Sequence, residues 1–404
     1  MNRVLGTFWI SILILSATGT GQAQGISSIL ERLETLEQRV DQVGSSGKLP
    51  NMSGYDEILS NVEIQLAGCA APCPPASNAP RKTEAGCLST CAPSPELEIS
   101  GFADQSIFFD SSSNKATFGF DQVEVDIIKN LGATGSLRVD LEWASDGEGG
   151  FTPDVEQGFV TFRPEFAGKG AFTFGKFNAP IGFELLDAPD MFQYSHALVF
   201  NHGLPTNLSG LMYNAPIGAW DLAAYVCNGW DVNVDPDNDK TVGCRLGYSG
   251  CDRGGLGFSI IHGNETFVSE ESYQGKLTVF DIDAFFDPAA NWTTGAEFNL
   301  GNNDLGNSIE NWWGFLVMSH WDFTEAVGAT IRYDYFDDTD NSRLESGAAS
   351  PEVRQAIAVA PTFVLGDGMG ALIEARVDFS DQEVFDDNSS KSEFTLAFEM
   401  TYTF

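Results

Sequence analysis

Residues 392–404 read SEFTLAFEMTYTF, and their side chains alternate between two chemical characters. The apolar set is Phe394, Leu396, Phe398, Met400, Tyr402 and Phe404, and the set between them is Thr395, Ala397, Glu399, Thr401 and Thr403. Successive side chains of a β-strand point to opposite faces, so the segment predicts a strand with one apolar and one polar face. A strand with lipid outside and water inside has this pattern, which predicts a closed membrane barrel.

The same alternation recurs from residue 97 onward in sixteen segments separated by turn-rich connections. We place strands at 97–109, 116–128, 134–145, 155–164, 170–178, 207–214, 219–229, 240–249, 254–263, 273–286, 291–301, 308–321, 325–336, 353–365, 370–380 and 391–404. Short connections follow even-numbered strands, as at 366–369, and longer ones follow odd-numbered strands, as at 179–206. This order predicts an all-β, transmembrane, antiparallel up-and-down barrel with both ends in the periplasm.

The composition also argues against a helical membrane protein. Hydrophobic residues make up 43% of the chain, yet after the first twenty residues no apolar run approaches the roughly 18 to 20 residues of a spanning helix. Lys and Arg total 21 against 57 Asp and Glu, a net charge of −36. No basic patch, phosphate loop or dinucleotide glycine motif is present, so we expect no nucleic acid partner.

The N-terminus has the features of an export signal. Arg3 precedes an apolar stretch, and Gly21 and Ala23 are the small residues that signal cleavage prefers, so residues 1–23 predict a signal peptide. A single membrane anchor is the alternative, but the apolar stretch is short for one. Export of a barrel-patterned chain predicts the bacterial outer membrane, with its lipid and lipopolysaccharide as surroundings.

Two further segments precede the barrel region 97–404. Residues 25–44 carry apolar residues at heptad spacing and predict a short periplasmic coiled coil that helps a homotrimer to assemble. An amphipathic helix on the barrel, or a partly disordered segment, is the alternative. Residues 45–96 are rich in Cys, Pro and Gly and predict a linker. Its cysteines, in an exported chain, favour disulfides within or between chains over a zinc site: Cys69, Cys73, Cys87 and Cys91.

Charged residues on alternate positions of the predicted strands indicate a wet interior. Arg138 and Asp140 share one face of 134–145, Arg332 lies in 325–336, and Glu374 and Arg376 lie in 370–380. Repeated charges of both signs do not suit a dry core, because an unpaired buried charge costs several kcal/mol. A barrel of about sixteen strands is wide enough to hold an aqueous channel. These residues are therefore predicted to line a pore wall.

The longest connection, 179–206, is rich in apolar residues for an external loop, so we expect it to fold into the barrel mouth as a constriction loop. The polar residues expected at the narrowing are Glu184, Asp187, Asp190, His196 and His202. The wall arginines expected to face them and to create a transverse field are Arg138, Arg163, Arg332 and Arg376. The alternative is that each arginine pairs with neighbouring acids and only stiffens the wall.

Other reactive residues carry weaker predictions. Cys227 and Cys244 flank one outward loop and could form a disulfide across the hairpin, with Cys251 left unpaired. The four histidines show no Ser-His or Asp-His grouping by spacing, so no catalytic residue is expected. The acidic outward loops lack the glycine of a calcium-loop motif, which favours solvated charge over a metal site, and no cofactor is expected.

The run Gly175–Glu184, GKFNAPIGFE, together with Ala188-Pro189-Asp190 and Tyr194-Ser195, resembles the fifth-strand and constriction-loop signature of OmpL-like outer-membrane β-barrel porins. Phe404, which ends an aromatic strand, resembles the C-terminal signal that the barrel-assembly machinery recognises. The resemblance covers residues 97–404 and implies passive diffusion of small hydrophilic solutes, without catalysis. The cysteine-bearing linker departs from the family's pattern.

Acidic outward loops attract cations, so the sequence predicts a weakly cation-preferring porin. Two other classes stay open. One is an envelope-tethering structural barrel anchored through its N-terminal coil, and the other is a rim-active outer-membrane hydrolase. Ion conductance in planar bilayers separates the porin from the tether.

Overall fold

A computed structural model describes residues 97–404, except 148–149, 237, 252, 268–272 and 345–350. The predicted signal peptide (1–23), coil (25–44) and linker (45–96) lie outside the described residues. So do the four linker cysteines, whose pairing stays a prediction.

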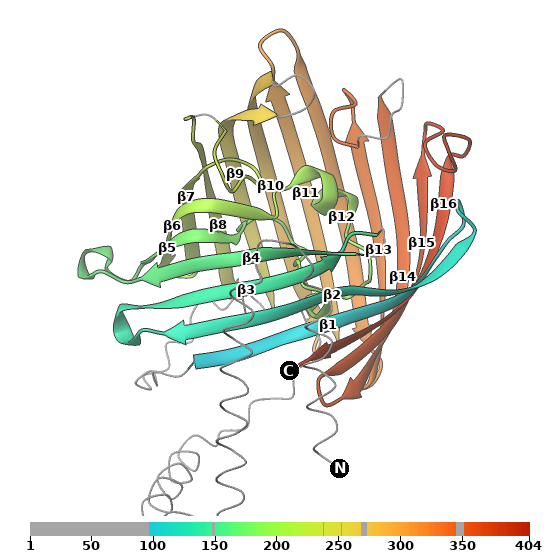
Figure 1. The fold of residues 1–404 in the computed structure, drawn as a ribbon, viewed down its shortest axis with the longest axis horizontal. Helices are drawn as coiled ribbons and strands as arrows, with labels where there is room; N and C mark the ends of the chain where they lie inside the picture. Colours follow the sequence, from blue (N-terminus) through green and yellow to red (C-terminus); the bar gives the residue numbers. More distant parts are fainter. Residues whose placement is uncertain (1–96, 148–149, 237, 252, 268–272, 345–350) are drawn as a thin grey trace, which may run out of the picture. The chain divides into compact units, whose positions relative to one another are not determined.

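Sixteen β-strands form one closed sheet (Figure 1). They are β1 (Leu97–Asp110), β2 (Lys115–Asn130), β3 (Gly135–Ser145), β4 (Phe151–Phe162), β5 (Ala171–Asn178), β6 (Asn207–Ile217), β7 (Trp220–Cys227), β8 (Thr241–Cys251), β9 (Gly254–Phe267), β10 (Tyr273–Ala289), β11 (Trp292–Asp304), β12 (Ile309–Asp322), β13 (Val327–Asp338), β14 (Glu352–Gly366), β15 (Met369–Ser380) and β16 (Ser392–Thr403). Each strand pairs antiparallel with its neighbours in the chain, and β1 pairs with β16. The predicted sixteen-stranded barrel is confirmed.

The seam between β1 and β16 extends from Phe102 opposite Thr403 to Asp110 opposite Thr395. Beyond it, Phe404 N donates to Gly101 O at 3.0 Å, and Gly101 N donates to Phe404 O at 3.2 Å. A Cβ atom at Gly101 would lie 2.2 Å from the Glu124 carbonyl oxygen and 2.9 Å from the Phe404 ring. Glycine is therefore required where the last residue closes the barrel.

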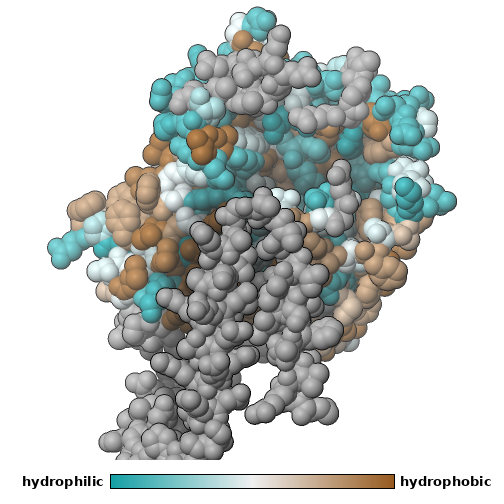
Figure 2. Space-filling model, in the orientation of Figure 1, coloured by the Kyte–Doolittle hydropathy of each residue, from teal (hydrophilic) through white to brown (hydrophobic). Residues whose placement is uncertain are grey.

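The two faces of the sheet differ as the sequence pattern predicts. Along β16 and the final residue, the even-numbered side chains from Phe394 to Phe404 are exposed on the outside. Ala397 and Glu399 between them are buried on the inside. On β13, Ile331 is exposed while Arg332 is fully buried. Figure 2 shows apolar side chains on the outside of the barrel and hydrophilic side chains at its upper, loop-bearing end. Among the described residues, no helix is long and apolar enough to cross a bilayer.

Short helical pieces occur only in connections among the described residues. They are η1 (Gly132–Thr134), η2 (Glu165–Ala167), η3 (Ala188–Asp190) and α4 (Leu198–Gly203). The tight turn between β14 and β15 uses Asp367 and Gly368, both with positive φ. Small or short polar residues adopt that conformation at low cost. The connection of 179–206, which holds η3 and α4, is the longest between described strands.

The outer face can be tested with a charge. Ile331→Arg should lower the free energy of unfolding in lipid vesicles by about 2–4 kcal/mol, because a charged side chain near the middle of the lipid-facing band is desolvated. Denaturant titration followed by tryptophan fluorescence measures this. Val234→Arg is the matched control: Val234 is 83% exposed in the β7–β8 connection, and no change is expected. Equal losses in both variants would contradict the assignment of the outer face.

Candidate functional site

The loop of residues 179–206 lies inside the barrel. Its ends are joined, because Ala179 N donates to Thr206 O at 2.8 Å. Helix α4 contacts β11, β12 and β13, and η3 contacts β1 and β16. Figure 1 shows α4 beside the inner side of β11–β13. The loop therefore extends across the lumen from one part of the wall to another.

Apolar packing fixes one side of this loop to the wall. Loop and inward strand residues form one buried cluster, which includes Phe192, Leu198, Val199, Leu277, Trp312, Leu316, Met318 and Phe336. Val199 and Leu316 are fully buried. Burying apolar surface stabilises a structure by roughly 25 cal/mol per Å². The apolar residues that make this loop unusual in the sequence thus cover an apolar part of the inner wall.

Arg332 on β13 connects the wall to the loop. Its Nη1 donates to Glu184 Oε1 at 2.7 Å and to the Ser195 carbonyl oxygen at 2.6 Å. Its Nε donates to Asp334 Oδ2 at 3.1 Å. The guanidinium is fully buried, and a buried charge requires such partners. Arg332 therefore holds the loop at two points, the side chain of Glu184 and the backbone of Ser195, and pairs with Asp334 on its own strand.

Arg376 on β15 makes a second, similar connection. Its Nη1 donates to Ser195 Oγ and to the His196 carbonyl oxygen, both at 2.8 Å. Its Nε donates to Asp378 Oδ2 at 2.7 Å. Nearby, Glu374 Oε2 accepts a hydrogen bond from Ser195 N at 3.3 Å. Arg332 and Glu374 thus bind the backbone of Ser195, and Arg376 binds its hydroxyl and the backbone of His196.

These contacts correct the expected transverse field. Glu184 does not face Arg332 across water but forms a direct ion pair with it. Arg332 and Arg376 contact the loop itself, and each also pairs with an acid two residues along its own strand. The alternative interpretation, pairing that stiffens the structure, describes both arginines. This pairing does more than stiffen the wall, because the same two arginines also bind Glu184, Ser195 and His196 and so fix the loop.

Arg163 does not lie on the inner wall. Strand β4 ends at Phe162, and Arg163 is exposed in the following turn, where its backbone N donates to Thr134 O at 2.9 Å. The predicted strand extended two residues too far, because Arg163 continues the alternation while Pro164 already begins the turn.

On the other side of the loop, Asp187 lies close to acids of the wall, with Arg138 as a positive charge nearby. Asp187 approaches Glu124 on β2 and Glu156 on β4, with ligand oxygens of all three within 4.8 Å of one another. Burial, together with Glu156 and Asp190, raises the pKa of Asp187. Sequence reasoning did not select Glu124 or Glu156.

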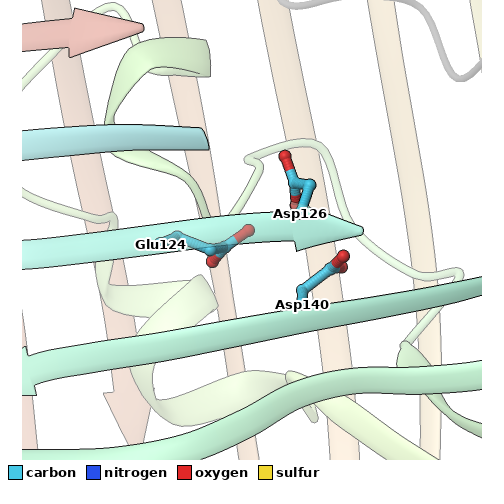
Figure 3. Close-up of side chains that lie close together, drawn as sticks. All are labelled: Glu124, Asp126 and Asp140. Atoms are coloured by element: carbon cyan, nitrogen blue, oxygen red, sulfur yellow. The ribbon is translucent and has the colours of Figure 1, made fainter. Parts of the chain in front are cut away.

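A second acidic group adjoins the first one. Glu124 and Asp126 project from β2 and Asp140 from β3 (Figure 3), again with oxygens within 4.8 Å. Here Arg138 supplies positive charge: Nε donates to Asp140 Oδ2 at 2.8 Å, and Nη2 donates to Asp126 Oδ1 at 3.3 Å. Gln157 Nε2 also donates to Asp140 Oδ2 at 2.6 Å. Arg138 and Asp140 are thus neighbours on the wall.

The loop histidines have structural surroundings. His196 Nε2 lies 2.9 Å from the Leu185 carbonyl oxygen, and its ring stacks on Phe200 with centroids 4.0 Å apart. Burial lowers the pKa of His196. Burial, with Arg354 and Arg343 nearby, lowers the pKa of His202 to about 4. Neither ring therefore carries positive charge at neutral pH.

The structure does not bring Cys227 and Cys244 together. Both thiols are free; Cys227 pairs in register with Thr241, and Cys244 pairs with Ala224. The two cysteines are therefore three residue pairs apart on neighbouring strands, and an odd offset places them on opposite faces of the sheet. This geometry does not meet the requirements of a disulfide.

His320 lies beside a threonine and an aspartate, an arrangement that the spacing of residues in the sequence did not predict. His320 Nδ1 lies 2.8 Å from Thr330 Oγ1, and its Nε2 lies 3.1 Å from Asp322 Oδ1. The Thr330 hydroxyl is buried, and it donates to the Phe192 carbonyl oxygen at 3.0 Å. A hydroxyl covered by the loop offers no access to a substrate, so the grouping anchors the loop.

Comparisons with known proteins agree with this architecture. The sequence model of one family, beta-barrel porin-2, OmpL-like, matches residues 115–404. A search of curated proteins finds no match. Among solved structures, the fold is similar to OmpT of Vibrio cholerae in its trimer form, with 12% identity, a TM-score of 0.56, and coverage of 76% of this chain and 99% of that one.

Two more solved structures show the same fold. The outer-membrane channel DcaP of Acinetobacter baumannii has 13% identity and a TM-score of 0.56, and covers 76% of this chain and 97% of its own. An anion-selective porin from Comamonas acidovorans has 9% identity and a TM-score of 0.55, and covers 76% and 99%.

The role of Arg332 in fixing the loop can be measured. Arg332→Met should destabilise the barrel by about 3–5 kcal/mol, because it leaves Glu184 and Asp334 as buried carboxylates without their partner. Limited proteolysis should then cut within 179–206. Urea titration and mass spectrometry of the fragments provide the two measurements. Arg163→Met is the control, and an equal loss of stability there would contradict the assigned contacts.

Proposed function

Because the chain belongs to the beta-barrel porin-2, OmpL-like family, we propose that it forms a water-filled channel for passive diffusion of small hydrophilic solutes and ions. The family and the fold place it in the bacterial outer membrane. The observation that carries the proposal is the inner face of the barrel, where charged residues alternate with lipid-facing apolar residues along β3, β13 and β15. Charged residues at these positions do not face lipid. The loop covers Arg332 and Arg376, whereas Asp126, Arg138 and Glu142 stay partly exposed on the inner side of β2 and β3.

We propose a weak preference for cations. Inward acids on β2–β4 outnumber Arg138, the arginine of these strands, which pairs with Asp126 and Asp140. Glu124, Asp140 and Glu156 are buried, whereas Asp126 and Glu142 are partly exposed and can meet a passing ion. Another acidic group, formed by Asp104, Asp121 and Glu399, lies where β1, β2 and β16 meet. A water-filled lumen that is lined mainly by one sign of charge and enclosed by a low-dielectric wall concentrates ions of the opposite sign. This charge distribution supports the selectivity more directly than the net charge does.

Loop 179–206 acts in this proposal as a constriction. It is fixed by Arg332 and Arg376 on one side, and its Asp187 faces the acids of β2–β4 on the other. Solutes pass between the loop and the remaining wall, where its acidic residues select by charge. Asp187, Asp190, Arg138 and Asp140 keep the role that the sequence analysis gave them. Glu184, Arg332, Glu374 and Arg376 hold the loop instead, His196 packs within it and His202 packs against Phe336 of the wall, and Arg163 lies outside the wall.

We propose a homotrimer with its short turns in the periplasm. The solved OmpT of Vibrio cholerae is described in a trimer form, and the N-terminal coil would strengthen such an assembly. The terminal Phe404, paired with Gly101 at the seam, is the residue that the barrel-assembly machinery would recognise. Light scattering of the full chain, and of a chain lacking residues 25–96, tests the oligomer.

Selectivity gives the direct test of the pore. In planar bilayers with a KCl gradient, the full chain should conduct. The sign of its reversal potential should show a preference for K⁺ over Cl⁻. Glu142→Lys, which reverses a charge beside Gln122 and Glu156 on the wall, should shift that potential towards chloride. Glu325→Lys makes the same charge change in the exposed β12–β13 turn and should leave it unaltered.

Two results would contradict the proposal. A folded barrel that passes no current would leave the structural tether as the explanation, and a chloride preference in the unmodified chain would reject the cationic selectivity. Vesicle swelling with sugars, amino acids and phosphate of graded size then measures which small solutes pass.

A further inference from the structure

A β-bulge directs one carboxylate into the lumen. Asp140 on β3 pairs with Gln157 on β4, but the next residue, Leu141, pairs with Val155, so Glu156 has no partner in the register. A bulge adds one residue to a strand and redirects a side chain, and bulges are frequent beside functional sites. Val155 is exposed on the outside and Gln157 is buried. The extra residue, Glu156, is only 3% exposed.

The acids that meet Glu156 have carboxylate oxygens without partners. Both carboxylate oxygens of Glu156, Oε2 of Glu124 and Oδ1 of Asp187 are buried and accept no hydrogen bond from the residues that the structure describes. Glu124 is 1% exposed. Buried carboxylate oxygens are unfavourable unless a hydrogen bond, an opposite charge or a metal ion contacts them. Three of them converge here from two strands and the loop.

Arg138 does not meet this need. Its guanidinium already donates to Asp126 and Asp140 in the adjoining group. That group therefore has a counter-charge in direct contact. Arg138 acts on Asp187 from a distance, but among the described residues no ion pair joins it to Glu124, Glu156 or Asp187.

We propose that Glu124, Glu156 and Asp187 bind a divalent cation of the calcium class, which ties the loop 179–206 to the wall formed by β2 and β4. Carboxylate oxygens are the ligands that Ca²⁺ prefers, and it takes about 6–8 of them at roughly 2.3–2.6 Å, with water completing the shell. Two oxygens bound to one such ion lie at most about 5 Å apart, and these three carboxylates meet that limit. Mg²⁺ is less suited, because it requires shorter bonds in a strict octahedron.

The site would complete the attachment of the loop. Arg332 and Arg376 hold its Glu184 and Ser195 against β13 and β15. The ion would hold Asp187, three residues beyond Glu184, against the opposite part of the wall. The loop would then be fixed at both sides of the lumen, and its position would depend on calcium.

The experiment measures calcium binding directly. The full chain, purified in detergent and stripped with EDTA, is titrated with CaCl₂ by calorimetry at pH 7.5. We expect one ion per protomer. Glu124→Gln/Glu156→Gln should weaken binding at least tenfold, because the amides keep the size of the side chains but remove both charges. Glu325→Gln/Asp367→Asn, which removes two carboxylates from exposed turns, should bind as the unmodified chain does.

A second measurement follows the loop. Calcium should protect residues 179–206 from limited proteolysis in the unmodified chain but not in Asp187→Asn. That substitution lies outside the strands, so it leaves the barrel intact, and far-ultraviolet circular dichroism verifies this. The absence of stoichiometric binding, or an equal loss in the turn variant, would overturn the site and indicate that the three acids share protons instead. Conductance is recorded on the same samples, so failure of the metal site is distinguishable from failure of the pore.

Discussion

Hydrogen bonding of the backbone in lipid is the constraint on which the rest of the structure depends. No water is available in the hydrocarbon region, so every peptide group of a spanning strand must pair with another strand, and only a closed sheet leaves no edge. The pairing of β1 with β16, completed by Phe404 and Gly101, provides that closure. Closure of sixteen strands in turn creates an interior too wide for wall side chains alone to fill.

The width of that interior explains why the loop 179–206 folds into the barrel. A wide lumen leaves Leu277, Trp312, Leu316 and Phe336 on an inner wall that would otherwise meet water, and the loop covers them with Val199 and its neighbours. Burial under the loop removes water from Arg332 as well, which is why that guanidinium needs Glu184, Ser195 and Asp334 together. Apolar packing and charge pairing thus depend on each other at this side of the barrel.

The sequence predicted the strands because their signal is local. A period of two residues is visible within each segment, and the turns between segments carry their own residue types, so all sixteen strands could be placed. The loop's apolar content also predicted that it turns inward. Its contacts could not be predicted in the same way, since Glu184 and Arg332 lie 148 residues apart and meet only through the register of intervening strands.

Departures from the alternation were harder to interpret. Glu156 is inserted between an outward and an inward residue, and a single unpaired residue is invisible until both strands are aligned. Glu124 lies at an ordinary inward position, and only the approach of Asp187 distinguishes it. Arg163 shows the opposite error, because it continues the alternation past the point where Pro164 ends the strand.

The barrel itself does not determine which ions pass. A porin described as anion-selective shares this fold at 9% identity, so the fold alone does not impose a preference for cations. The preference for cations or anions must come from the few charged side chains that stay unpaired in the lumen. In this chain Arg332 and Arg376 are engaged by the loop and Arg138 by Asp126 and Asp140, which leaves carboxylates in excess beside Asp187. The same pairing that fixes the loop therefore removes its arginines from the field that a passing ion meets.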